Sequence, residues 1–282
     1  MIKNAQEMLD RARLQTGNKT VAIAMANDSS VLHAVVEAEQ EGLIHAILVG
    51  DATEMKEIAE SGDFSLDEME IIDEKDPAKG CALAVDLAAS GKAQFLMKGF
   101  VKTAVLLKAL LSRPELKARD VMSHVAVLDI PGRDGLLFFT DGGMIPKPDT
   151  RQKEAICRNM ADLARALGIS PFRFGFLAPY ADEESPEHEE ICKHLADLGP
   201  TFQPMSTVTA EYAFQQLDGL VATAIEECNT IIKGLTLHTD TVFSGLIMGT
   251  TVPVCLVSRS DSVTNKKASL ALGVLYAGGG EK

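Results

Sequence analysis

Between residues 20 and 111, short apolar runs alternate with longer amphipathic segments, and this alternation constrains the fold more than any other feature. The apolar runs are typical of buried parallel strands. The segments between them have helical spacing and follow residues that can cap a helix. Strands alternating with helices at this spacing predict a parallel sheet covered by helices on both faces. Four strand and helix pairs are predicted, at 20–26 and 31–43, 45–50 and 51–61, 69–72 and 76–90, and 94–100 and 102–111.

The pattern changes near residue 119, where a second domain is predicted to begin. "DVMSHVAVLDI" (120–130) and "LLFFTD" (136–141) read as two strands joined by the turn "PGRDG". A long helix is expected next, capped by Asp149 or Thr150 and closed by Gly168. A further strand is expected at 172–179.

The C-terminal part of the chain is harder to interpret. "NTIIKGL" (229–235) resembles a strand, and "DTVFSGLIMGT" (240–250) resembles a helix that ends at Gly249. "VPVCLV" (252–257) has the composition of a buried strand, and 263–277 has helical spacing.

Composition excludes several classes of function. The formal net charge is −13, there is no Lys/Arg tract, and only 5% of residues are aromatic, so a nucleic acid partner is not expected. No apolar run approaches the roughly 20 residues of a membrane helix, and no signal-peptide pattern opens the chain. The sequence therefore predicts a cytoplasmic protein without a membrane partner.

The five cysteines are widely spaced and form no CxxC pair, which argues against a disulfide framework and fits a reducing cytoplasm. In "HEEICKH", His188 and Cys192 would share a helix face, whereas His194 would face away. A solvated acidic helix is the favoured interpretation, and no metal site is predicted.

Polar and basic residues follow several of the predicted strands. The chain has neither GxxxxGK[ST] nor GxGxxG, so no nucleotide fingerprint is present. In open parallel sheets, ligands bind at the carboxyl ends of the strands, where helix N-termini present free amides. The junctions that combine this geometry with polar side chains are "KGFVKT", "FTDGGMIPKPDT" and "VSRSDS".

Ser258 and Arg259 directly follow the strand "VPVCLV". A hydroxyl and a guanidinium at this point suit a phosphate or acyl phosphate, because arginine can bind it bidentately. A capping serine beside a surface arginine is the alternative. Lys98, Lys102 and Lys108 likewise either face the same anion-binding pocket or form a solvated face.

These motifs together resemble the phosphate acetyl/butyryl transferases, and within them the phosphate butyryltransferase branch. The resemblance rests on "FLMKGFVKTAVLLKALL", "MSHVAVL", "LLFFTDGG" and "PVCLVSRSDS" in this order, and it covers most of 18–170 and 246–278. It implies an α/β fold of two α/β/α three-layer domains with mostly parallel sheets and a cleft between them. The domains would comprise 1–118 plus about 260–282, and 119–259. It also implies a homodimer that transfers a short-chain acyl group reversibly between coenzyme A and phosphate, with coenzyme A as substrate and no tightly bound cofactor.

The resemblance also implies roles for individual residues. Arg259 would hold the phosphoryl oxygens, Ser258 would donate a hydrogen bond, and Lys108 stands where relatives often carry an arginine. The other residues expected to contact substrate are Lys98, Gly99, Lys102, Thr103, Thr140, Asp141 and Asn265.

This sequence departs from the family pattern in two places. Relatives of the acetyl branch carry an acidic residue, the proposed thiol base, where this chain has Thr264 and Asn265. Three alternatives remain for the group that favours the thiolate: Asp261 could act as the base, a residue from another segment could do so, or local positive potential could suffice. The segment 199–245, which shapes the acyl pocket in relatives, is only partly similar, so the acyl group is left open.

Two other functions stay open on these residues. A family member that binds coenzyme A or an acyl phosphate without turnover would explain Thr264 and Asn265. A metal-dependent dehydrogenase of the related isocitrate-dehydrogenase-like fold would need several converging aspartates, and the only candidates are Asp141 and Asp218.

Overall fold

The computed structural model describes residues 2–17, 19–178 and 185–279, and the chain divides into two compact units. The terminal unit comprises residues 8–118 and 250–282, and the central unit comprises residues 1–7 and 119–249. The sequence-based division placed residues 1–7 in the first domain and 250–259 in the second, whereas contacts group 1–7 with the central unit and 250–259 with the terminal unit. The expected cleft stays a prediction.

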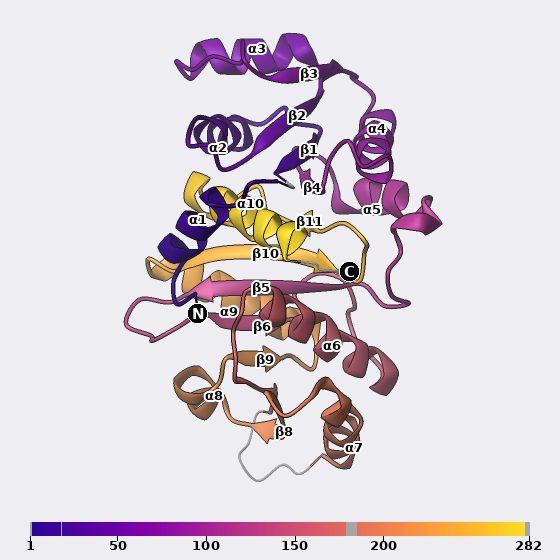
Figure 1. Cartoon of the computed structure of the whole chain (residues 1–282), viewed down its shortest axis with the longest axis vertical. Helices are drawn as coiled ribbons and strands as arrows, with labels where there is room; N and C mark the ends of the chain where they lie inside the picture. Colours follow the sequence, from indigo (N-terminus) through magenta and orange to yellow (C-terminus); the bar gives the residue numbers. More distant parts are fainter. Residues whose placement is uncertain (1, 18, 179–184, 280–282) are drawn as a thin grey trace. The chain divides into compact units, whose positions relative to one another are not determined.

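The terminal unit is built on five parallel strands in the order β3-β2-β1-β4-β11 (Figure 1). Helices α2, α3 and α10 cover one face, and α4 and α5 pack together on the other. The elements that the structure describes are α1 (Ala5–Arg13, which continues from the central unit), β1 (Thr20–Ala24), α2 (Ser29–Gln40), β2 (His45–Gly50), α3 (Ala52–Ser61), β3 (Glu70–Asp73), α4 (Pro77–Ala89), β4 (Phe95–Lys98), α5 (Thr103–Leu111), the 3-10 turn Pro114–Leu116, β11 (Val254–Cys255) and α10 (Val263–Gly278).

Local sequence explains why these helices begin where they do. Asp28, Asp51 and Asp76 directly precede α2, α3 and α4, and each carboxylate accepts one or two backbone N–H groups of the first turn. Such caps satisfy donors that a helix cannot pair internally. Strands β1, β2 and β4 are almost entirely buried, as expected for parallel strands covered on both faces.

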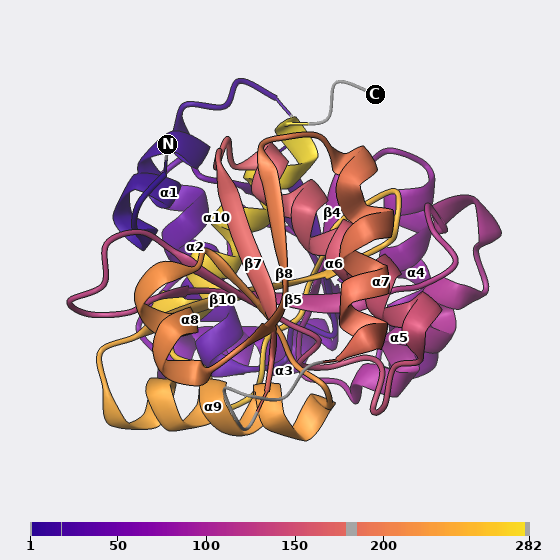
Figure 2. The same cartoon turned by 90° about the horizontal axis from the view of Figure 1, so that it is seen from below.

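The central unit has its strands in the order β10-β5-β6-β9-β7-β8. Strand β5 pairs antiparallel with β10 and β6, and the remaining pairs are parallel. Its elements, followed in Figures 1 and 2, are β5 (Ser123–Asp129), β6 (Leu137–Thr140), α6 (Thr150–Ala166), β7 (Phe172–Leu177), α7 (Pro186–His194), the 3-10 turn Leu195–Leu198, β8 (Phe202–Val208), α8 (Ala210–Gln216), β9 (Gly219–Val221), α9 (Ile225–His238) and β10 (Val242–Met248).

A hydrophobic core in the central unit joins the sheet to α8 and α9. Phe139 of β6 and Leu128 of β5 belong to one buried cluster with Ala213 of α8 and Ile232 of α9. Helix α6 lies against β5, β6 and β9 and begins at a capping box formed by Asp149 and Gln152. Figure 2 shows α6 and α7 on the side of these strands away from α8 and α9.

Most of the expected elements are present, and the α/β class with mostly parallel strands is confirmed. The expected strand at 229–235 and helix at 240–249 were wrong, because the structure has α9 over the first and β10 over the second. In α9, Cys228 and Ile232 are four residues apart and both buried, which is helical spacing. The segment 242–248 is a short apolar run that pairs with β5, and such a run reads equally well as helix or strand in the sequence.

Candidate active site

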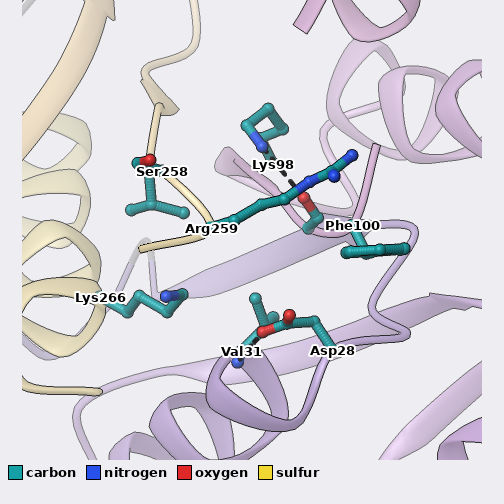
Figure 3. A pocket seen from close by; sticks show the side chains of 9 residues that line it. Asp28, Val31, Lys98, Phe100, Ser258, Arg259 and Lys266 are labelled. Carbon is teal, nitrogen blue, oxygen red and sulfur yellow. Dashed lines mark hydrogen bonds between the residues drawn. The ribbon is translucent and has the colours of Figure 1, made fainter. Parts of the chain in front are cut away.

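A pocket of the terminal unit lies at the carboxyl ends of β1, β4 and β11. These three strands are adjacent and parallel, so their carboxyl ends share one edge of the sheet. The strand order reverses direction at β1, and a crevice at such a point is the general ligand site of open α/β sheets. Figure 3 shows the side chains that face the pocket, and those on which the argument depends are Asp28, Lys98, Phe100, Ser258, Arg259 and Lys266.

Gly99 allows the end of β4 to approach the end of β1. A Cβ atom at Gly99 would lie 2.1 Å from the carbonyl oxygen of Met25, so no side chain fits there. The N–H of Phe100 donates to the same carbonyl oxygen at 2.6 Å. Met25 has a φ of +59°, a left-handed conformation that is uncommon for a residue with a side chain. The junction "KGF" is therefore held in one shape by backbone contacts.

Lys98 is a buried basic residue of the pocket, with a relative exposure of 5%. Its Nζ donates to two backbone carbonyl oxygens, of Gly99 at 3.1 Å and of Val101 at 3.4 Å. Burial lowers the pKa of the Lys98 amine from its usual value, and the positive charges of Arg259 and Lys266 lower this pKa further.

Arg259 extends over the pocket from the loop after β11. Its guanidinium carbon lies 4.5 Å from the centroid of the Phe100 ring, in a cation–π contact. Ser258 does not cap the following helix, because Ser262 is the N-cap of α10 and accepts the N–H of Asn265. The hydroxyl of Ser258 lies 3.2 Å from that of Ser260.

Asp261 and Lys266 hold the loop that carries Ser258 and Arg259. The carboxylate of Asp261 accepts the backbone N–H of Ser258 at 2.6 Å. The Nζ of Lys266, which is only 1% exposed, donates to the backbone carbonyl of Asp261. Both contacts fix the loop relative to the first turn of α10. The carboxylate of Asp261 is therefore engaged in the turn itself.

The other residues expected to contact substrate do not line this pocket. Lys102 is the N-cap residue of α5 without a side-chain capping bond, and Lys102 and Lys108 are exposed. Thr103 is half-buried at the start of α5, and Asn265 is buried in the first turn of α10.

Thr140 and Asp141 belong to the central unit, where β6 ends. The hydroxyl of Thr140 donates to the carbonyl of His124 at 2.9 Å. The buried carboxylate of Asp141 accepts four backbone N–H groups, among them those of His124 at 3.0 Å and Gly143 at 2.9 Å. Burial raises the pKa of Asp141, and these hydrogen bonds oppose the rise. The Asp141 carboxylate therefore organises its own loop.

Sequence reasoning did not single out Asp28, Phe100 or Lys266 as pocket residues. Asp28 was visible within "NDSS" only as part of a capping cluster, and its carboxylate accepts the N–H of Val31 and the hydroxyl of Ser30. Lys266 lies in a helix whose spacing gave no sign of a buried cation. The adjacency of β1, β4 and β11 is what brings these residues together.

Within the described ranges, no helix is long and apolar enough to cross a membrane, and no group of three or more His, Cys, Asp or Glu side chains is placed to hold a metal ion. The side chains of "HEEICKH" have separate neighbours. His188 stacks on Phe176 with the ring centroids 4.2 Å apart, and the Nδ1 atom of His194 lies 3.1 Å from a carboxylate oxygen of Glu154.

Comparison with known proteins identifies the family. The sequence profile of the phosphate acetyl/butaryl transferases matches residues 5–82 and 77–196, which together span more than half of the chain. The protein belongs to this family. The phosphate butyryltransferase of Clostridium beijerinckii is 35% identical and aligns over 98% of this chain and 99% of its own. A phosphate acetyltransferase of Rhizobium meliloti is 30% identical over 96% of this chain and 92% of its own.

A solved structure gives the same result for the fold. The branched-chain phosphotransacylase of Enterococcus faecalis V583 superposes with a TM-score of 0.77 at 26% identity, covering 92% of this chain and 99% of that one. Family membership confirms the resemblance inferred from the motifs and the expectation of a phosphate acyltransferase. The metal-dependent dehydrogenase is set aside on the same ground.

Proposed function

We propose that this protein transfers a short-chain acyl group reversibly between coenzyme A and inorganic phosphate, and that the pocket at the ends of β1, β4 and β11 binds the phosphoryl group. The observation that carries this assignment is the convergence of Lys98, Arg259 and Lys266 on one pocket in a chain of net charge −13. A phosphate or acyl phosphate is an anion that such a pocket would attract. The planar guanidinium of Arg259 can bind two of its oxygens at once.

The chemistry requires positioning and charge stabilisation. In one direction the thiolate sulfur of coenzyme A attacks the carbonyl carbon of the acyl phosphate, the bond from that carbon to the phosphate oxygen breaks, and phosphate leaves with the electron pair. In the other direction a phosphate oxygen attacks the thioester and the thiolate leaves. Holding both reactants in line can lower the barrier by about 7–11 kcal/mol. Arg259 would hold the phosphoryl oxygens, and the hydroxyl of Ser258 would donate to an oxygen that gains charge.

Asp261 is assigned a positioning role. Because its carboxylate accepts the N–H of Ser258, it sets the direction in which Ser258 and Arg259 leave the strand. Lys102 and Lys108, which are exposed on α5, would attract the anionic coenzyme A over a longer range. Thr103, Asn265, Thr140 and Asp141 remain proposed substrate contacts.

The acyl group is proposed to be short, either straight or branched. The relatives named above comprise a butyryltransferase, an acetyltransferase and a branched-chain phosphotransacylase, so several small acyl groups are compatible with the family. The reaction needs coenzyme A as a substrate, and no resident metal or cofactor is part of the proposal.

Thiol release tests this function directly. Purified protein is mixed with acetyl-, propionyl-, butyryl- or isobutyryl-CoA, with and without phosphate, and free thiol is followed with a thiol reagent. Release that requires both protein and phosphate supports the proposal, and the best substrate of the panel identifies the acyl group. Failure of phosphate to stimulate release from any of these thioesters would contradict the proposal.

A second candidate function is binding of coenzyme A or an acyl phosphate without turnover. It is favoured by Thr264 and Asn265, because neither side chain can act as a general base. In that case the panel would show no release, while coenzyme A would still raise the melting temperature of the protein.

The working form is proposed to be a cytoplasmic homodimer. The five cysteines are all free in the structure, which fits a reducing compartment. Light scattering coupled to size exclusion would test the dimer, since a monomeric mass across the working concentration range would contradict it. Localisation of the tagged protein in cell fractions would test the compartment.

A further inference from the structure

The attacking sulfur must lose a proton, and the pocket has few groups that can accept it. A free thiol with a pKa of about 8.5 is only a few per cent ionised at pH 7. The carboxylate of Asp28 already accepts the N–H of Val31 and the hydroxyl of Ser30, where it caps α2. The carboxylate of Asp261 accepts the N–H of Ser258. Both carboxylates are therefore engaged in shaping the backbone around the pocket.

Three basic side chains remain, and they differ in how readily they exchange a proton. The guanidinium of Arg259 stays charged at any working pH. The Nζ of Lys266 is tied to the backbone of Asp261 at the start of α10. Lys98 forms no ion pair with a carboxylate among the residues that the structure describes, and its hydrogen bonds go to two neutral carbonyl oxygens.

The surroundings of Lys98 favour a neutral amine. A neutral amine has two N–H bonds and one lone pair, so the carbonyls of Gly99 and Val101 can accept both hydrogens and leave the lone pair available. An ammonium in the same place would carry a third N–H beside two other cations, Arg259 and Lys266. Lysine readily loses its proton when it is buried in this way.

We infer that Lys98 is the proton acceptor for the thiol of coenzyme A, and that the same Nζ returns the proton to the departing thiolate in the reverse reaction. The inference rests on the function proposed above. The S–H bond breaks as an N–H bond forms on Lys98, and the sulfur then forms its bond to the acyl carbon while phosphate leaves. The ammonium of Lys98 next gives the proton to phosphate or water, which restores the amine for another turnover.

The charged and titratable groups that act on Lys98 come from several elements. Arg259 and Lys266 disfavour its ammonium form, and Asp261 and Asp28 favour it to a smaller degree. The thiol of Cys81 on α4 is also near enough to feel the charge of Lys98, but burial raises the pKa of Cys81 to about 11, so it stays neutral through the working range. Burial and the two neighbouring cations therefore lower the pKa of Lys98, while the neighbouring thiol of Cys81 stays neutral.

The pH dependence of two variants separates proton transfer from a purely electrostatic role. Lys98→Arg keeps a positive charge that cannot be given up, and Lys98→Met removes both charge and proton transfer. Activity is measured as kcat/KM for coenzyme A in the direction that consumes acyl phosphate. Lys56, an exposed lysine on α3, provides the matched controls Lys56→Arg and Lys56→Met.

A proton acceptor predicts a loss that depends on pH. At pH 7, kcat/KM for coenzyme A should fall about 10²- to 10⁴-fold in both Lys98 variants, which is the usual contribution of a general base. In Lys98→Arg, the reduction in kcat/KM should become smaller as the pH passes the pKa of the thiol, because the thiolate then forms without a base. An unchanged rate in Lys98→Arg, or a loss that is the same at every pH, would overturn the inference. The Lys56 variants should keep the wild-type profile.

A second measurement does not depend on the variants being active. With ¹³C-labelled lysine, the Cε signal of Lys98 is assigned by its absence in Lys98→Met and titrated by NMR in the wild-type protein. A midpoint well below that of Lys56 supports the inference, and an equal midpoint contradicts it. If the wild-type protein shows no phosphate-dependent thiol release, the proposed function fails. If release is normal and the Lys98→Arg profile matches the wild type, only the role of Lys98 fails.

Discussion

At the scale of single residues, Ser258 and Arg259 show what local sequence can predict about a site and what only the structure shows. The pair was visible as a hydroxyl and a guanidinium after a buried strand, but a capping serine with a surface arginine explained the same letters. The structure removes the capping role of Ser258, because Ser262 caps α10. Arg259 is exposed, and its guanidinium lies over the Phe100 ring at the pocket that Lys98 also lines. Lys98 itself could be predicted as a basic residue at a strand end, but its burial could not.

Arg259→Ala should reduce turnover far more than Lys108→Ala. Arg259 lines the pocket and can bind two phosphoryl oxygens at once, whereas Lys108 lies on α5 and does not line the pocket. Loss of one donor that stabilises developing charge typically costs about 10²- to 10³-fold in kcat, and a remote surface charge changes kcat little. Steady-state kinetics of both variants with the best acyl-CoA checks this. Equal losses would contradict the roles assigned to the two residues.

The stability of the wild-type protein relative to Lys98→Met should rise with pH. The pKa of Lys98 is lowered in the folded state, so between that pKa and about 10.4 the unfolded chain binds more protons than the folded one. The free energy of unfolding therefore increases with pH across this window, and Lys98→Met removes that increase. Urea unfolding of both proteins at several values between pH 7 and pH 10 measures the difference. A difference that stays constant with pH would show that the Lys98 pKa is not lowered.

At the scale of secondary-structure elements, the alternation of strands and helices in residues 20–111 could be predicted because α2, α3 and α4 each begin at a capping aspartate and the strands between the helices are short apolar runs. The region 199–250 could not, since its elements are short and its apolar runs fit both helix and strand. Helix α9 carries the adjacent β-branched residues Ile231 and Ile232, a residue type that is enriched in strands. Packing of α9 on the central sheet overrides that propensity.

Gly99→Ala should destabilise the protein strongly. The added Cβ would meet backbone atoms of Met25 and Ala24, which cannot turn away as a side chain would. Overpacking of this kind costs about 1–3 kcal/mol and occasionally more, and we expect the upper end here. Chemical unfolding gives the measurement, with Gly234→Ala in α9 as the control, because nothing lies within 4 Å of a Cβ there. If Gly99→Ala lowers the free energy of unfolding no more than Gly234→Ala does, the close approach of β4 to β1 is contradicted.

At the scale of the whole molecule, a chain of net charge −13 binds an anionic substrate only if its cations are concentrated. The order β1-β4-β11 achieves this by placing the basic side chains Lys98, Arg259 and Lys266 at one pocket, although Lys98 is far from the other two along the sequence. Strand order was the information that the sequence lacked. The carboxyl-end rule for parallel sheets could place Lys98, Gly99, Ser258 and Arg259 in advance, but not the members from β1 and α10.

Coenzyme A should stabilise the folded protein, and added phosphate should stabilise it further through Arg259. A ligand at 100 times its Kd adds about 2.7 kcal/mol to the free energy of unfolding. In Arg259→Ala the increment from phosphate should disappear, while most of that from coenzyme A remains. Thermal unfolding with each ligand, alone and together, tests this. Retention of the full phosphate increment in the variant would place phosphate elsewhere.

The central claim is that the pocket at the ends of β1, β4 and β11 supports the formation of an acyl phosphate. The most direct measurement is ³¹P NMR of a mixture of butyryl-CoA, phosphate and protein, repeated with Arg259→Ala and with isobutyryl-CoA. The account predicts an acyl phosphate signal that grows with wild-type protein and is reduced about 10²-fold or more in initial rate by the variant. Absence of this signal with every short-chain acyl-CoA, or an equal rate in Arg259→Ala, would contradict it.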